Sequence, residues 1–224
     1  MTETTKRQYT FIGGIVLGIL VIYFLSTAIS DKKLNSVKIL LDNEIENQLI
    51  LVKELASITG RGGGNELTEA VVPKCPIETR QKFDSLLSSL DKGLTKIELT
   101  ELNSLFNQCG YVFVGQRTVM LSQLQREIEI VEQMVLQRSI LGDFDEVAVD
   151  ISGWKELVSL EKSIRDEFES LVTVQRQIIL SLLQTNDLRS KEIIELRDKA
   201  SNIKGKLIVV TEKASTIRSN LIEA

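Results

Sequence analysis

Apolar residues recur every three or four positions through most of this 224-residue chain, and helix-breaking residues are confined to a few short stretches. That spacing places the apolar side chains on one face of an α-helix. Both prolines and a run of glycines fall between Gly60 and Pro76, and single glycines mark turns at Gly93, Gly110 and Gly142. The pattern predicts long helices joined by short connections, and therefore an all-α fold.

The breakers divide the chain into expected helices at 31–59, 77–91, 95–109, 116–141 and from 153 onward. Thr95 and Glu98 form a capping-box pattern, and Ser152 is the candidate N-cap of the last helix. The tripeptide Thr185-Asn186-Asp187 favours caps over helix interiors, so it predicts a separate final helix over 187–224. Short β-like patches at 70–72, 111–114 and 147–151 are interpreted either as a small sheet or as apolar loop residues.

The final helix has the most regular pattern in the chain. Its nine heptad positions are all apolar, and they are Ile193, Leu196, Ala200, Ile203, Leu207, Val210, Ala214, Ile217 and Leu221. This predicts a coiled-coil seam. The flanking positions are largely basic, so a parallel copy of the helix would oppose like charges. We therefore expect an acidic partner helix, and because Glu127 and Glu132 flank its stripe, the helix over 116–141 is the predicted one.

An uncharged stretch runs from Gln8 to Ser30 and has an apolar centre. About 20 apolar residues in a helix, at roughly 1.5 Å each, cross a bilayer core of about 30 Å. The sequence therefore predicts a short tail over 1–8, a single transmembrane helix over 9–30, and an elongated helical bundle or coiled coil over 31–224. The alternative is a cleaved signal peptide and a secreted protein, because Ala28-Ile29-Ser30 resembles a processing site.

Within the predicted span, Gly14 and Gly18 have the spacing that lets two membrane helices approach closely. They are the candidate residues for helix packing in the membrane. Glycine is also common in transmembrane helices without any such role, so both interpretations stay open.

Cys75 and Cys109 stand at the two ends of the expected helical hairpin over 77–109. Antiparallel arms bring these ends together, so we predict a disulfide that clamps the hairpin. Disulfides persist in oxidising compartments, which favours an extracytoplasmic location for the bundle. The alternative is a pair of buried free thiols in a cytosolic protein.

Composition excludes several kinds of chemistry. The chain has no histidine and two cysteines, so it cannot build a Ser-His-Asp triad or a four-thiolate zinc site from its own residues. A net charge of −4 argues against a nucleic-acid surface. Asp143, Asp145, Glu146 and Asp150 lack the spacing of a calcium loop and are interpreted as a solvated loop. We expect no enzyme activity, cofactor, metal or small-molecule substrate.

These features predict a non-catalytic, membrane-anchored helical scaffold, or an accessory subunit of a membrane-associated complex. Its expected partners are the lipid bilayer and another protein, or further copies of itself, bound through helix packing. The alternative is an extracytoplasmic sensor that binds a ligand between helices. In that case Arg117, Arg126 or Arg138 would hold an anionic ligand.

Overall fold

The computed structural model describes residues 31–60, 75–142, 150–185 and 187–223. The predicted transmembrane span over 9–30, including Gly14 and Gly18, lies outside the described residues, as do the patch at 70–72 and most of the acidic loop. Within the described ranges, no helix combines the length and the apolar character needed to cross a membrane.

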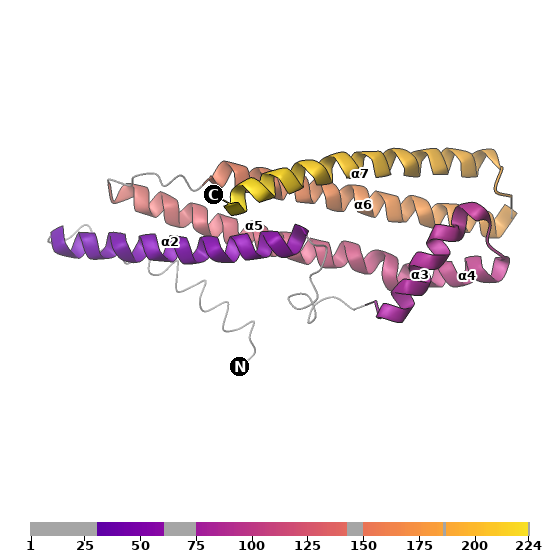
Figure 1. Cartoon of the computed structure of the whole chain (residues 1–224), viewed down its shortest axis with the longest axis horizontal. Helices are drawn as coiled ribbons and strands as arrows, with labels where there is room; N and C mark the ends of the chain where they lie inside the picture. Colours follow the sequence, from indigo (N-terminus) through magenta and orange to yellow (C-terminus); the bar gives the residue numbers. More distant parts are fainter. Residues whose placement is uncertain (1–30, 61–74, 143–149, 186, 224) are drawn as a thin grey trace. The chain divides into compact units, whose positions relative to one another are not determined.

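Every regular element in the described ranges is helical (Figure 1), so the all-α prediction is confirmed. In chain order the elements are α2 (Asp31–Gly60), α3 (Ile77–Ser89), the 3-10 turn η1 (Leu90–Lys92), α4 (Lys96–Leu105), the π-helical turn η2 (Phe106–Gly110), α5 (Tyr111–Ile140), α6 (Ile151–Thr185) and α7 (Lys191–Glu223). The break predicted near Asn186 is present between α6 and α7.

The chain divides into two compact units, each described here by itself. Of the described residues, unit 1 takes 31–50 and 129–142, and unit 2 takes 51–60, 75–128, 150–185 and 187–223. The long helices α2 and α5 each contribute residues to both units. In unit 1, the buried guanidinium of Arg138 joins the two helices, because its Nε donates to Oδ1 of Asp42 at 2.7 Å. Its Nη1 also donates to the carbonyl of Gly142 at 3.0 Å, just beyond the end of α5.

In unit 2, α6 and α7 lie side by side and run in opposite directions (Figure 1). The cross-helix pairs follow this order, since Ser181 contacts Glu192, Glu167 contacts Lys206, and Glu156 contacts Lys213. The face of α6 has its own heptad spacing, made by Trp154, Leu157, Glu161, Ile164, Phe168, Leu171, Gln175, Ile178 and Leu182. Seven of these nine residues are apolar, so α6 offers α7 a surface of matching period.

The main partner of α7 is therefore α6, and the prediction that it pairs with the helix over 116–141 is wrong. The connection from α6 to α7 is short, running from Asn186 to Ser190. A short connection between helices makes antiparallel neighbours of them at little cost in loop-closure entropy. The basic flank of α7 does meet acidic residues, as predicted, but they are Glu156 and Glu167 of α6.

The predicted helical hairpin is formed by α3 and α4, and its turn contains Gly93 at a φ of +95°. Its second arm does not stop at Gly110, as the sequence suggested, but continues through η2 into α5. A Cβ on Gly110 would lie 2.9 Å from Cδ1 of Phe106 and 3.5 Å from Val172. The absence of a side chain at Gly110 thus lets Phe106 and Val172 pack closely against the helix backbone. Residues 111–114 are helical, and no strand occurs among the residues described.

The N-cap of α6 also differs from the prediction. Asp150, and not Ser152, caps the helix, because its Oδ1 accepts a hydrogen bond from the backbone N–H of Gly153 at 2.7 Å. A side-chain oxygen before the first turn satisfies an amide that has no partner within the helix. The helix begins at Ile151, one residue before the predicted cap, and Ser152 lies in its first turn.

Two glycines within helices should respond oppositely to alanine. A Cβ on Gly205 of α7 would meet nothing within 4 Å, so Gly205→Ala is expected to raise the free energy of unfolding by about 0.5–1 kcal/mol through helix propensity. A Cβ on Gly153 would lie 2.9 Å from Cδ2 of Leu221, so Gly153→Ala should destabilise the protein. Urea unfolding followed by the fluorescence of Trp154 measures both changes. A change of the free energy of unfolding in the same direction for both variants would contradict this account.

Candidate functional site

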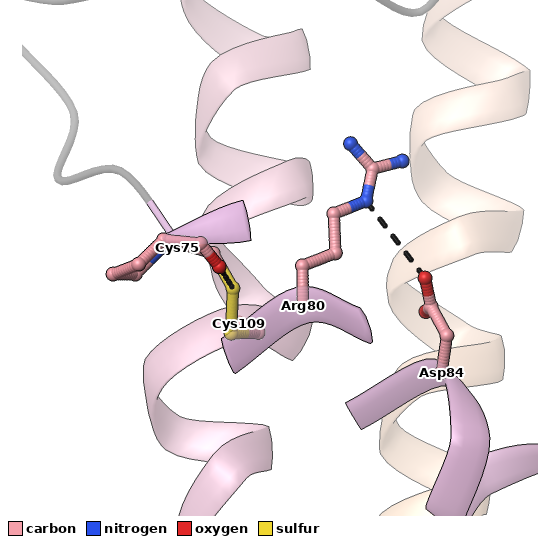
Figure 2. The surroundings of a disulfide bond; sticks show 5 residues. Cys75, Arg80, Asp84 and Cys109 are labelled. Atoms are coloured by element: carbon pink, nitrogen blue, oxygen red, sulfur yellow. Dashed lines mark hydrogen bonds and ion pairs between the residues drawn. A yellow bond between two sulfur atoms is a disulfide. The ribbon is translucent and has the colours of Figure 1, made fainter. Parts of the chain in front are cut away.

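The clearest covalent feature of unit 2 is the bond between Cys75 and Cys109 (Figure 2). The structure brings the two cysteines together as predicted, with their Cα atoms 5.0 Å apart. Cys75 immediately precedes Pro76 and α3, and Cys109 lies within η2. The pair therefore fastens the first residues of one arm to the last residues of the other, at the open end of the hairpin.

The two cysteines sit in different surroundings. Cys109 is fully buried in the apolar core of unit 2, whereas Cys75 is only partly buried beside it. Phe83 and Phe106 meet edge to face in the same core, with ring centroids 4.9 Å apart. The bond thus links a surface segment to the core on which α6 also packs.

The other end of the hairpin has the predicted capping box. Oε2 of Glu98 accepts hydrogen bonds from the Thr95 hydroxyl at 2.7 Å and from the Thr95 backbone N–H at 2.8 Å. In return, the backbone N–H of Glu98 donates to Oγ1 of Thr95 at 3.3 Å. The side-chain hydrogen bond, followed by the backbone one, lowers the pKa of Glu98 below its ordinary value.

This lowered pKa predicts a pH dependence. The contribution of Glu98 to stability should be fully present above the ordinary glutamate pKa of about 4.3 and should fade as the pH falls through the lower folded-state value. Glu98→Ala should therefore be less stable than the natural sequence at neutral pH, and the difference should shrink in acid. Thermal unfolding of both proteins between pH 7 and pH 3 tests this; a gap that widens in acid would contradict it.

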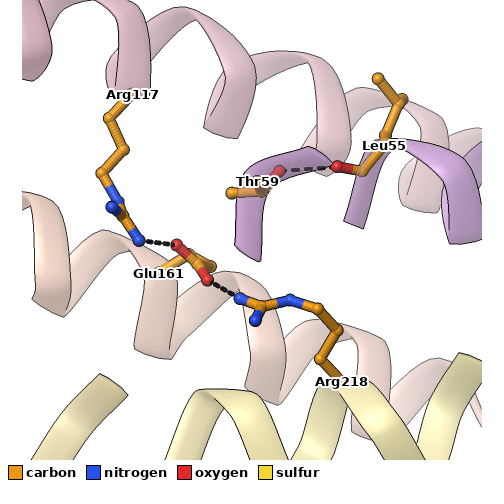
Figure 3. Close-up of polar contacts among 5 residues, drawn as sticks. All are labelled: Leu55, Thr59, Arg117, Glu161 and Arg218. Carbon is orange, nitrogen blue, oxygen red and sulfur yellow. Dashed lines mark hydrogen bonds and ion pairs between the residues drawn. The ribbon is translucent and has the colours of Figure 1, made fainter. Parts of the chain in front are cut away.

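Three helices of unit 2 meet at a buried carboxylate (Figure 3). Glu161 of α6 is 1% exposed and pairs with two arginines. Nη2 of Arg117, from α5, donates to its Oε2 at 2.8 Å, and Nη2 of Arg218, from α7, donates to its Oε1. Each carboxylate oxygen thus has its own guanidinium partner. We call these three residues the Glu161 cluster.

The Glu161 cluster has the chemistry of a clamp between helices. A general acid or base must exchange a proton with a substrate. Here both carboxylate oxygens accept hydrogen bonds from guanidinium groups, and the residue is 1% exposed, so a substrate has no free oxygen to approach. The cluster therefore joins the α5, α6 and α7 segments that carry it through one buried carboxylate.

The nine predicted seam residues lie along α7 as follows. Ile193, Ala200, Ile203, Ala214 and Leu221 are buried, and the other four are partly buried. Three of the basic residues that flank them pair with carboxylates. Nζ of Lys213 lies 2.8 Å from Oε1 of Glu156, and Nζ of Lys206 lies 3.7 Å from Oε1 of Glu167. Nη2 of Arg197 lies 3.2 Å from Oδ1 of Asp91. Each of these pairs has at least one well-exposed partner, and such pairs select a neighbouring helix more than they stabilise the fold.

Two arginines proposed as ligand-binding groups are engaged with carboxylates. Arg117 belongs to the Glu161 cluster, and Arg138 pairs with Asp42. A hollow of about 360 Å³ lies on α6, and all of its lining residues, from Ser159 to Ser170, come from that single helix. It is therefore an open groove on a helix surface. Among the described residues no group of three or more potential metal ligands occurs.

Sequence reasoning missed the Glu161 cluster, although a signal for it exists. Glu161 occupies a heptad position between Leu157 and Ile164, where an apolar residue is expected. An acidic residue at such a position implies a basic partner on a neighbouring helix. Arg218 is one of the basic residues that flank the α7 seam, but its partner cannot be identified without knowing that α6 faces α7.

Comparison of this chain with models of known protein families, with curated proteins and with solved structures gave no match.

Proposed function

We propose that this protein is a non-catalytic helical scaffold, or an accessory subunit of a membrane-associated complex. Residues 9–30 anchor it as a single transmembrane helix, and the helical bundle stands on the extracytoplasmic side. It acts through helix–helix contacts with protein partners. The observation that carries the proposal is the uncharged stretch of 23 residues from Gln8 to Ser30, with its apolar centre, in the amino-acid sequence.

The contacts within unit 2 support a structural role. Its polar interior groups serve to hold helices together, as the Glu161 cluster does for α5, α6 and α7. The Cys75–Cys109 bond suits a protein that works in an oxidising compartment. The sensor alternative has less support, because Arg117 and Arg138 already have carboxylate partners.

Extraction in a mild detergent tests the scaffold role. Membranes that contain the full chain would be solubilised gently, and the mass of the protein–detergent particle measured. We expect a particle that contains more than one polypeptide, either further copies or a partner. A monomer under every mild condition would contradict the proposal.

Thiol labelling tests the proposed side of the membrane. A membrane-impermeant maleimide added to intact cells should leave Cys75 and Cys109 unlabelled until the protein is reduced, because both sulfurs are bonded. After an impermeant reductant is added to intact cells, labelling of the partly buried Cys75 should appear under mild denaturation. Free thiols that react only after the cells are opened would instead place the bundle in the cytosol.

A further inference from the structure

The first half of α3 packs lightly against the rest of unit 2. None of the side chains from Ile77 to Lys82 is buried, and Ile77 is 76% exposed. The first buried residue of the helix is Phe83, and it is also the only one within α3. Its ring meets that of Phe106 in η2 edge to face. The contacts that bury apolar side chains of α3 therefore begin at the middle of the helix.

Two ion pairs of this first half lie at the surface. Lys82 pairs with Glu101 of α4, and their side chains are 55% and 37% exposed. Arg80 pairs with Asp84, which belongs to α3 itself (Figure 2). Exposed ion pairs contribute little to stability. An isolated helix of 13 residues is marginal in water, so the first half of α3 needs another attachment to stay docked.

The bond between Cys75 and Cys109 supplies that attachment. Cys75 stands two residues before α3 begins, and its partner Cys109 is fully buried in the core of unit 2. The other end of α3 is held differently, because Leu90 of η1 is buried and Asp91 pairs with Arg197 of α7. Loss of the covalent bond therefore leaves the first half of α3 without a buried or covalent link to the core.

The two sulfurs differ in their access to an external thiol. Thiol–disulfide exchange begins when a thiolate attacks one sulfur of the bond. Cys109 is 0% exposed, whereas Cys75 is only partly buried beside the core. An attacking thiolate therefore reaches Cys75, and the sulfur of Cys109 becomes the leaving group. Cys109 then takes up a proton, because a thiolate is disfavoured in apolar surroundings.

We propose that the Cys75–Cys109 bond is a redox-sensitive latch for the first half of α3, opened by a dithiol that attacks Cys75. One thiolate of the dithiol forms a mixed disulfide with Cys75 as the bond to Cys109 breaks. The second thiolate attacks this mixed disulfide and releases Cys75. In balance, the dithiol becomes a disulfide, and its two electrons and two protons leave both cysteines as thiols.

The opened latch has a defined local structure. The segment 76–82 separates from unit 2, while Phe83 and η1 keep the remainder of the hairpin docked. Short segments with few buried contacts open at much lower free energy than the core does. Reoxidation joins the two sulfurs again and returns the segment to its place. The latch is independent of the proposed membrane anchor, since all of its parts lie in unit 2.

Hydrogen exchange of the full chain tests the latch. The backbone N–H of Arg80 donates to the carbonyl of Pro76 at 2.8 Å, so it is the first amide that the helix protects. In excess dithiothreitol, the protection factors of Arg80, Gln81 and Lys82 should fall below about ten, because frayed helix ends open at almost no cost. Amides of α6 beside Glu161 should stay far better protected, since their exchange requires unfolding of the unit. Removal of the reductant and reoxidation should restore the protection.

Two variants supply matched controls. Cys75→Ala should lose the same protection without any reductant, and dithiothreitol should then have no further effect on residues 80–82. Asp91→Ala removes a pair at the other end of α3, where the aspartate side chain is 77% exposed. With the bond intact, this variant should keep residues 80–82 protected.

Alkylation identifies the accessible sulfur. Brief treatment of the reduced, folded protein with iodoacetamide should modify Cys75 at least about tenfold faster than Cys109, which becomes accessible only when the core opens. Peptide mass spectrometry measures both rates. Equal rates, or faster modification of Cys109, would overturn the assignment of Cys75 as the attacked sulfur.

The exchange data can also overturn the latch itself. If residues 80–82 keep their protection after reduction, the other contacts of α3 suffice to hold it. If they exchange only as fast as the amides of α6, the bond supports the whole unit and no local opening occurs. If they are unprotected before any reductant is added, the bond does not hold the segment.

Discussion

Glu161→Ala is expected to lower the free energy of unfolding of unit 2 by about 3 kcal/mol, the lower end of the range for removing one partner of a buried ion pair. The carboxylate is 1% exposed, and its loss leaves Arg117 and Arg218 close together without a counter-charge. Arg117 retains some exposure to water, which moderates the cost. Urea is the suitable denaturant because guanidinium salts screen charges, and the fluorescence of Trp154, the only tryptophan, reports unfolding of this unit.

A triple substitution separates two free energies: the cost of leaving buried charges unpaired, and the net contribution of the whole Glu161 cluster to stability. Replacing Arg117, Glu161 and Arg218 together with leucine or methionine removes all three charges and should restore most of the lost stability. Glu167→Ala is the matched control on α6, because this partly exposed residue pairs with the exposed Lys206 and its loss should cost less than about 1 kcal/mol. Equal losses for Glu161→Ala and Glu167→Ala would contradict the description of the cluster.

Replacing both Cys75 and Cys109 with alanine should lower the free energy of unfolding by about 3 to 4 kcal/mol. The bond closes a loop across a sequence separation of 34 residues, and the chain-entropy model gives this magnitude for a loop of that length. Removal of the bond mainly increases the conformational entropy of the unfolded chain, so the helical content of the folded protein should change little. Urea unfolding with Trp154 as the probe again measures it.

Reduction of the natural sequence provides the control for the cysteine variant. Dithiothreitol should destabilise the natural protein by a similar amount and should leave the double alanine variant unaffected. Identical unfolding curves for the natural protein with and without reductant would show that the thiols are free, and would favour the cytosolic alternative.

Much of the helical framework can be predicted from the sequence because its signals are local. The start of α3 follows from Pro76, and the capping box of Thr95 and Glu98 fixes the start of α4. Spacings of three and four residues identify the apolar faces without knowledge of what they contact. The pairing of Cys75 with Cys109 follows from the antiparallel hairpin, which is itself a local structure.

The errors arise where a residue has a tertiary role. Gly110 resembles a helix stop, but the helix continues through it, and its lack of a side chain makes room for Phe106 and Val172. The partner of α7 was misassigned because Glu161 and Gln175 interrupt the apolar heptads of α6 and hide the matching seam. A charge inside an apolar stripe is interpretable once its partner helix is known, and periodicity alone does not identify that helix.

Anchoring at residues 9–30 is the central claim, and partition of the full chain between membrane and alkaline buffer measures it most directly. We predict that the chain stays in the membrane pellet. A variant with Ile19→Arg and Leu20→Arg should be released, because each charge at the centre of a span costs about 2.5–3.5 kcal/mol on insertion scales. Recovery of the natural chain in the soluble fraction, with or without those arginines, would contradict the account.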